Sequence, residues 1–209
     1  MKTLLITLAT FLLTSNAFSA TAFNNNKPLP AGFQYVDTRS SEYQTYFNIR
    51  KKAIDLIRLA QKGHNGYKLD ESASKLGEQV IQELLLASFA ISTNSSSKEY
   101  CADNSAFVNS FYPRTIFICD PARDALQKKP SEKHIKMAAQ MFIHEGAHLV
   151  DHKEANYKIK KYDECYPSLF ELLVMEIDYG RKNIPSMGSR DAYRSQCEVL
   201  AEYDDVPSE

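Results

Sequence analysis

The spacing of apolar residues predicts long helices over most of the chain. Three stretches place apolar residues at roughly helical spacing: Ser41 to about Gln61, where the spacing alternates between three and four, Glu71 to Ser92, and Ser131 to His152. This spacing gives a helix one apolar face to bury and one polar face for water. A further helix is predicted to begin near Pro167, a favoured residue in a first helical turn, and a last one to span Ser189 to Tyr203. We interpret the first two helices as scaffold.

Two short stretches before the third helix have a different pattern. Ala106 to Val108 and Thr115 to Cys119 consist mostly of aliphatic, aromatic and β-branched residues, and Asp120-Pro121 follows the second of them. They predict a hairpin or two short paired strands. Residues 21–35 are polar, contain two prolines and predict an extended arm. The predicted fold class is therefore α+β and predominantly helical, with a small sheet or hairpin before the third helix.

Residues 1–20 have the pattern of a secretory signal peptide. A positively charged start is followed by the apolar run Leu4 to Leu13, which is too short to span a bilayer comfortably, and then by small residues. We expect cleavage between residues 17 and 22, leaving a single domain over residues 21–209. The mature protein is expected to be exported, hence periplasmic or secreted, with no stable membrane insertion after the signal is removed.

The overall charge excludes one class of partner. The net charge is −1 with 24% charged residues, so there is no electrostatic basis for binding nucleic acid. The 209 residues suffice for one domain with a sizeable core, and no internal repeat is visible. The sequence makes no prediction of the oligomeric state.

Four cysteines remain in the expected mature chain. An even count in an exported protein predicts two disulfides, and four cysteines allow three pairings. We favour Cys101–Cys119, which closes the segment with the two strands, and Cys165–Cys197, which ties two C-terminal helices. A zinc ion bound by cysteines is disfavoured, because the chain has no C-x-x-C spacing.

The third predicted helix contains the sequence His-Glu-x-x-His. His144 and His148 are one helical turn apart and lie on the same face, so two neutral imidazoles can bind one metal ion there. Glu145 follows the first histidine and can reach a water on that metal without being a ligand. The alternative is a pair of core or surface histidines beside a solvated glutamate. The spacing, the acid and the mostly apolar helix together favour the metal site.

This arrangement resembles the zincin metallopeptidases, and within them the gluzincin-type branch, whose third ligand is a glutamate. The resemblance covers roughly Cys101 to Cys197. It implies a Zn²⁺ ion bound by His144 and His148, a peptide or protein substrate, and hydrolysis of peptide bonds by a metal-activated water with Glu145 as general base. It also sets residues 115–120 in the place of the edge strand that binds substrate.

The third metal ligand is predicted from a weaker likeness. Residues 163–167 partly resemble the E-x-x-A segment of such families, which makes Glu164 the third ligand, although Pro167 stands where a small residue is usual. Glu171 is the runner-up, and Asp191 and Glu176 are the remaining acids considered.

Other residues near the motif are considered as a metal ligand, as an outer-shell partner of the metal or as stabilisers of the oxyanion. His152 lies two turns from His144, roughly 12 Å along the axis, so a straight helix cannot bring both to one ion with His148. Asp151 is better placed as an outer-shell partner. Tyr166 and Tyr193 are candidates to stabilise the oxyanion, although a packed tyrosine is the more common case.

Two other functions remain open at this stage. One is a helical binding or inhibitor domain, stapled by disulfides, whose His-Glu-x-x-His is inactive. The other keeps the zinc ion but changes the substrate to an amide bond of peptidoglycan. Metal analysis distinguishes the first from a peptidase, and digestion of peptides distinguishes the second.

Overall fold

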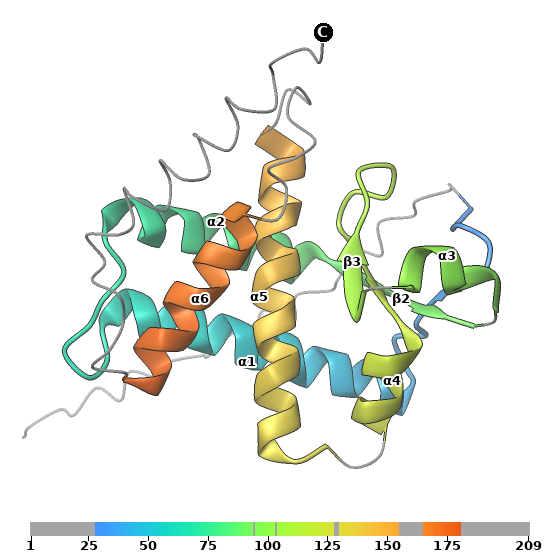
Figure 1. The fold of residues 1–209 in the computed structure, drawn as a ribbon, viewed down its shortest axis with the longest axis horizontal. Helices are drawn as coiled ribbons and strands as arrows, with labels where there is room; N and C mark the ends of the chain where they lie inside the picture. Colours follow the sequence, from blue (N-terminus) through green and yellow to red (C-terminus); the bar gives the residue numbers. More distant parts are fainter. Residues whose placement is uncertain (1–27, 94, 103, 128–129, 155–164, 181–209) are drawn as a thin grey trace, which may run out of the picture.

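The computed structural model describes residues 28–93, 95–102, 104–127, 130–154 and 165–180. The predicted signal peptide, Glu164, Cys197 and the predicted helix over residues 189–203 therefore lie outside the described residues. Four long helices and a small sheet make up the described chain (Figure 1). The helices and strands, in chain order, are β1 (Phe33–Tyr35), α1 (Ser41–Lys62), α2 (Glu71–Leu86), β2 (Ser88–Ser92), the 3-10 turn η1 (Ser95–Ser97), α3 (Lys98–Cys101), β3 (Ala106–Val108), β4 (Thr115–Ile118), α4 (Asp120–Gln127), α5 (Glu132–Glu154) and α6 (Cys165–Tyr179).

The first helix agrees closely with its prediction, because both of its ends carry local signals. The side chain of Ser40 accepts a hydrogen bond from the backbone N–H of Tyr43, which caps the N-terminus. Gly63 ends the helix with a φ of 96°, a left-handed conformation that suits glycine, and its N–H bonds to the carbonyl of Leu59.

The predicted α+β class with mainly helical content is confirmed by the set of helices and strands.

The second helix is shorter than predicted. It ends at Leu86, and the residues that continue the apolar pattern form β2, so the predicted end at Ser92 is wrong. Ala87 is already extended, and the buried guanidinium of Arg50 donates to the carbonyls of Leu84 and Ala87 at 3.4 and 3.2 Å. These bonds satisfy carbonyls that a helix C-terminus leaves without partners.

The sheet has the order β1-β2-β4-β3. β2 and β4 are parallel, whereas β1 and β3 run antiparallel to their neighbours. The predicted pairing of Ala106–Val108 with Thr115–Ile118 is confirmed. The predicted arm over residues 21–35 needs correction, because Phe33–Tyr35 pairs with β2 as an edge strand. Residues from Asp120 onward form the short helix α4, which the pattern did not predict.

The expectation that residues 115–120 form an exposed edge strand is wrong. β4 lies between β2 and β3, and all four of its residues are fully buried. The edge strand on this side is β3, and it packs against α5. A strand that is buried on both faces has a continuous apolar run, which by itself does not distinguish a central strand from an edge strand.

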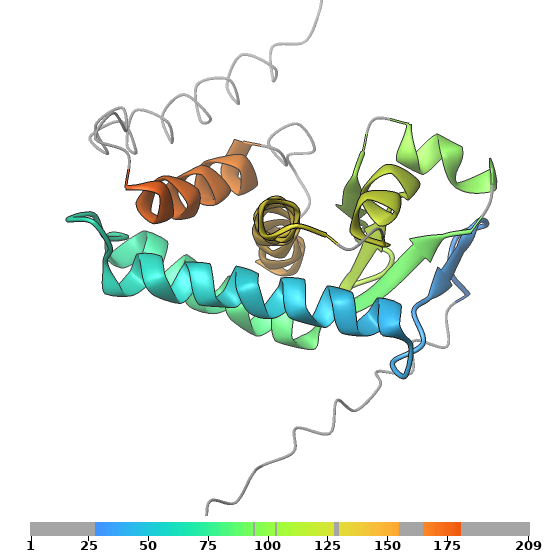
Figure 2. The ribbon, with the colours of Figure 1, turned by 90° about the horizontal axis from the view of Figure 1, so that it is seen from below.

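The two faces of the sheet are covered differently. Phe89, Ile91, Ile116 and Ile118 point into the main core, which the sheet shares with α1, α2, α5 and α6. The opposite face carries a small aromatic cluster, in which the rings of Phe107 and Phe117 stack at 4.7 Å. Figure 2 looks nearly along α5 and shows this helix in the centre, with α6 on one side, the sheet on the other and α1 across one face. α5 is therefore the central element of the described chain.

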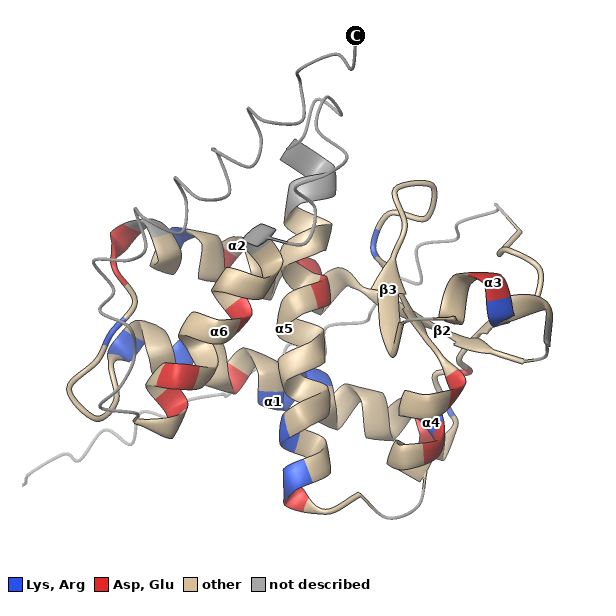
Figure 3. Cartoon of the chain, in the orientation of Figure 1, with Lys and Arg blue, Asp and Glu red and all other residues tan. Residues whose placement is uncertain are grey.

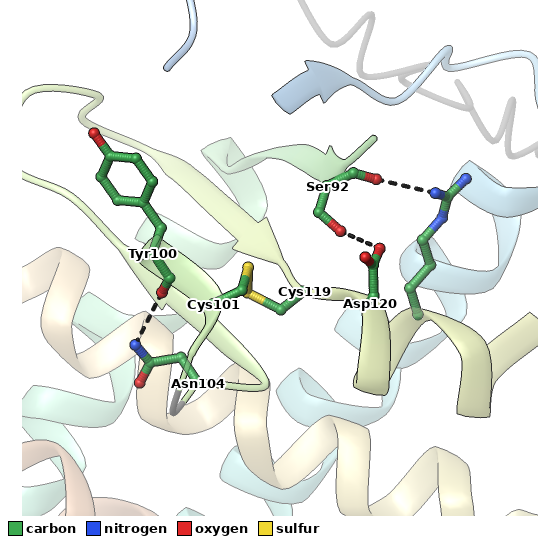
Figure 4. The surroundings of a disulfide bond; sticks show 7 residues. Ser92, Tyr100, Cys101, Asn104, Cys119 and Asp120 are labelled. Carbon is green, nitrogen blue, oxygen red and sulfur yellow. Dashed lines mark hydrogen bonds between the residues drawn. A yellow bond between two sulfur atoms is a disulfide. The ribbon is translucent and has the colours of Figure 1, made fainter. Parts of the chain in front are cut away.

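The predicted disulfide between Cys101 and Cys119 is present, with the two Cα atoms 5.6 Å apart. Figure 4 shows it beside the hydrogen bond between the side chains of Ser92 and Asp120. It joins α3 to the end of β4 and so closes the segment that contains the two paired strands. The partner predicted for Cys165 lies outside the described residues, and that pairing stays a prediction.

Both signs of charge occur on each of α1, α2, α4 and α5 (Figure 3). Across the residues that the structure describes, none of the helices combines the length and apolar character needed to cross a bilayer.

Candidate functional site

The helix that carries His-Glu-x-x-His begins and ends within two residues of its prediction. α5 covers Glu132–Glu154, against a predicted Ser131 to His152. Ser131 Oγ accepts a hydrogen bond from the backbone N–H of His134 at 3.3 Å, which is the bond of an N-cap residue. The predicted start of the helix is therefore confirmed, and the capping bond of Ser131 accounts for it.

The glycine of the motif determines how closely α5 approaches α2. A Cβ atom added at Gly146 would lie 2.8 Å from Val80 Cγ1 and 3.0 Å from Leu84 Cγ. Real Cβ atoms do not approach other atoms so closely, so only glycine allows the two helices to pack at this distance. The contact buries one face of α5, while the row at positions 140, 144 and 148 follows the i, i+4, i+8 spacing of a second face.

The two histidines of the motif direct the same ring nitrogen at each other. His144 Nε2 and His148 Nε2 are 3.1 Å apart, and the ring centroids are 4.8 Å apart at 71°. This separation suits an N–H···N hydrogen bond. It is also close to the spacing of two nitrogens on one tetrahedral zinc ion, about 3.3 Å for bonds of about 2.0–2.1 Å. The predicted convergence of the two imidazoles is thus present in the structure.

The other ring nitrogen of His144 contacts α6. Its Nδ1 lies 3.0 Å from Oε2 of Glu171. The second carboxylate oxygen of Glu171 accepts a hydrogen bond from the side-chain amide of Gln140. The carboxylate thus bridges two residues that lie one turn apart on α5.

The acid of the motif is in a largely dehydrated position. Glu145 is 5% exposed and His148 is 6% exposed, whereas the side chain of His144 retains 17% of its exposure. The burial of Glu145 differs from the solvated glutamate of the alternative interpretation. Burial strengthens the electrostatic interactions of this carboxylate with whatever occupies the site.

The predicted third ligands fall in different places. Glu164 and Asp191 lie outside the described residues, as does Tyr193. Glu171 faces Nδ1 of His144, and Glu176 is buried on α6 at 9% exposure. Within the described ranges, no group of three or more histidine, cysteine, aspartate or glutamate residues could hold a metal ion. The described part of the site therefore supplies a pair of imidazoles.

The role of Gln140 was missed from the sequence. Its signal was present, because Gln140 lies four residues before His144 and so shares its helix face. What the spacing lacked was the acid from α6 that connects the two side chains.

Comparison with protein-family models, with curated proteins and with solved structures gives no match.

Proposed function

We propose that the protein is an exported zinc-dependent metallopeptidase. In this proposal His144 and His148 bind the ion through Nε2, Glu164 is the third ligand, and Glu145 is the general base. The observation that carries the proposal is the 3.1 Å approach of the two Nε2 atoms, together with the burial of Glu145, which follows His144 in the sequence. The hydrogen bond that this distance also allows does not by itself account for the burial of the acid that follows His144 in the sequence.

The donor set suits zinc. Two neutral imidazoles and a carboxylate are ligands that zinc takes in catalytic sites, where one position stays open for water or substrate. When bound, the ion would supply a Lewis acid that acidifies water and polarises a carbonyl.

Glu145 would handle the proton of the reaction. Its carboxylate accepts a proton from the attacking water and returns that proton to the leaving nitrogen of the cleaved peptide bond. The burial of Glu145 keeps bulk water from competing for this proton transfer.

The edge strand beside α5 supports a peptide as the substrate. The backbone N–H of Cys119 bonds to the carbonyl of Ser105 at 3.0 Å. In an antiparallel pair every second residue makes such bonds, so the backbone N–H and C=O groups of Phe107 also point toward β4. The N–H and C=O groups of Ala106 and Val108 then point away from the sheet. An extended peptide can pair with such an edge through its main chain.

The experiment is zinc analysis of the purified, folded protein, together with peptide-library digestion before chelation, after chelation and after zinc is restored. We expect about one zinc per chain and hydrolysis that follows the zinc content. The matched variant His144→Ala/His148→Ala, checked for folding by circular dichroism, should lose both. A folded wild-type protein that takes up no zinc would contradict the proposal and favour the binding or inhibitor domain. Zinc-dependent cleavage of peptidoglycan alone would favour the amidase.

A further inference from the structure

The carboxylate of Glu171 is held entirely by α5. One oxygen faces His144 Nδ1 at 3.0 Å, and the other accepts from the amide of Gln140. Among the described residues it meets no lysine or arginine, and the side chain of Glu171 is only 20% exposed. A half-buried acid whose two partners are a neutral amide and an imidazole is not an ordinary surface ion pair.

We propose that Glu171 and Gln140 form a positioning pair that orients His144 toward the metal, and that Glu171 is not a metal ligand. The inference rests on the proposed function. It decides between two roles for Glu171, the runner-up ligand of the sequence prediction.

Ring geometry carries the first step. The two nitrogens of an imidazole point in divergent directions, and His144 directs Nε2 at His148 while Nδ1 faces Glu171. An oxygen bound to Nδ1–H therefore lies on the far side of the ring from an ion at Nε2. Zinc binds carboxylate oxygens at about 2.0–2.2 Å, so this oxygen cannot serve both contacts.

The tautomer of His144 is the second step. A carboxylate oxygen only accepts hydrogen bonds, so it selects the form of the imidazole that carries its proton on Nδ1. Nε2 then presents a lone pair, which is what a metal ion requires. Carboxylates that bind the outer nitrogen of a metal-ligating histidine orient the ring and raise its basicity in this way.

Gln140 supplies the third step. Its amide fixes the rotation of the Glu171 carboxylate without neutralising its charge, so the full charge remains available to His144. Gln140 and His144 are one turn apart on the same helix, and the carboxylate from α6 therefore has a two-point attachment to α5. Gln140 on α5 thus holds Glu171 on α6, and Glu171 in turn holds His144 in one orientation.

A second polar contact between the same helices offers a matched control. Lys136 on α5 pairs with Asp178 on α6, and its Nζ lies 3.9 Å from the ring centroid of Tyr179. Lys136 is one turn before Gln140 and two turns before His144, roughly 12 Å along the helix axis. We therefore expect its loss to weaken the packing of α5 on α6 and to leave the orientation of His144 unchanged.

The test compares Gln140→Leu, Glu171→Gln and Lys136→Met by zinc affinity, by the Co²⁺ absorption spectrum and by thermal unfolding without metal. We expect Gln140→Leu and Glu171→Gln to weaken zinc binding by about 10–100-fold. Their Co²⁺ spectra should keep the wild-type band pattern, because the ligands are unchanged. Lys136→Met should bind zinc as the wild type does.

Three outcomes would overturn the inference while the proposed function stands: unchanged zinc affinity in both site variants, an equal loss in Lys136→Met, or a Co²⁺ spectrum in Glu171→Gln that has lost a ligand. If Glu171→Gln does not fold, Gln140→Leu decides alone. A wild-type protein that binds no zinc would overturn the proposed function, and this inference with it.

Discussion

Glu171 and Glu42 each connect two helices of the described chain, and the two glutamates have different partners. Glu171 connects α6 to α5 through His144 and Gln140. Glu42 on α1 accepts from Nε of Arg123 on α4 at 2.7 Å, and its other oxygen accepts from the same guanidinium at 3.3 Å. One contact uses an imidazole and an amide, and the other uses a permanent cation.

The Glu42 contact is a balanced ion pair. Burial opposes the charged form of Glu42, but hydrogen bonds from Arg123, Tyr46 and Gln127 outweigh it and hold the pKa of Glu42 below its ordinary value. Burial, and then the charge of Glu42, raise the pKa of Tyr46 far above its ordinary value. Arg123 also donates to the carbonyl of Ser92 at 3.0 Å, which ties α4 to β2. In this network the charge of Glu42 is paired with that of Arg123, and the pair connects α1, α4 and β2.

The Glu171 contact contains no lysine or arginine among the described residues. A negative group that faces an imidazole can orient it and strengthen it as a ligand, whereas a guanidinium in the same place would cancel that effect. The carboxylate that meets arginine holds two helices together, whereas in our proposal the carboxylate that meets His144 prepares a metal site.

The largest expected effect is on the rate of peptide hydrolysis at the histidine site. Glu145→Gln should retain zinc but lower peptide hydrolysis by about 100-fold to 10,000-fold, because the amide cannot accept the proton of water. Zinc content and initial rates on one peptide measure both quantities. Wild-type rates from a zinc-loaded variant would remove Glu145 from the mechanism.

The third ligand gives the next largest effect. Glu164→Ala should weaken zinc binding by more than the factor of about 10–100 expected for loss of an outer-shell partner. Asp191→Ala is the matched control and should bind zinc normally. Competition with a chelator of known affinity measures the change, and circular dichroism confirms folding. Tight zinc binding by folded Glu164→Ala would exclude this ligand but would leave His144 and His148 in place.

Loss of the ion pair between Arg123 and Glu42 should lower stability and leave activity unchanged. Arg123→Met leaves the part-buried Glu42 without its guanidinium and should lower the free energy of unfolding by about 1–3 kcal/mol. Lys51→Met is the control on the same helix, since the side chains of its pair with Asp55 are 68% and 48% exposed, and it should change stability by at most about 1 kcal/mol. Urea unfolding measures both variants. Equal losses would mean that the Glu42 network has no special role.

A variant at the edge of β3 tests peptide binding independently of the Glu171 and Glu42 contacts. Val108→Pro removes an N–H that points away from the sheet and should lower kcat/KM by about tenfold, the equivalent of one hydrogen bond, with zinc affinity unchanged. Phe107→Pro removes an N–H inside the ladder and should destabilise the fold. Normal kcat/KM in Val108→Pro would exclude this edge as the peptide site.

The smallest expected effect is a dependence on pH. Because the pKa of Glu42 is lowered in the folded protein, its contribution to stability is present above the ordinary value of 4.5 and is lost as the pH falls through the folded pKa. Glu42→Gln should therefore lose less stability than the wild type between about pH 6 and about pH 3. Urea unfolding at the two pH values measures the difference. Equal losses would contradict an ionised, stabilising Glu42.

Much of the helical fold could be predicted, because its signals are local. The helical spacing identified α1, α5 and the start of α6, and Ser131 and Gly63 marked helix ends through bonds to their own neighbours. The antiparallel pairing of β3 with β4 and the disulfide of Cys101 also followed from nearby residues.

The strands that were missed depend on distant partners. Ser88–Ser92 continues the apolar pattern of α2 and becomes a strand because β1 and β4, from far along the chain, pair with its two sides. For the same reason the sequence could not tell that β4 is central and β3 is the edge. A run of four apolar residues has no periodicity that separates these cases.

At the site, the sequence by itself determined that His144, Glu145 and His148 share a helix with the two imidazoles one turn apart, since helix geometry alone sets that spacing. Only the tertiary structure decided what each side chain meets. The packing of α6 on α5 brings Glu171 to the outer nitrogen of His144, and the close approach of α2 at Gly146 buries the opposite face. Spacing along one helix says nothing about the crossing of two, and that crossing determines which nitrogen a carboxylate reaches.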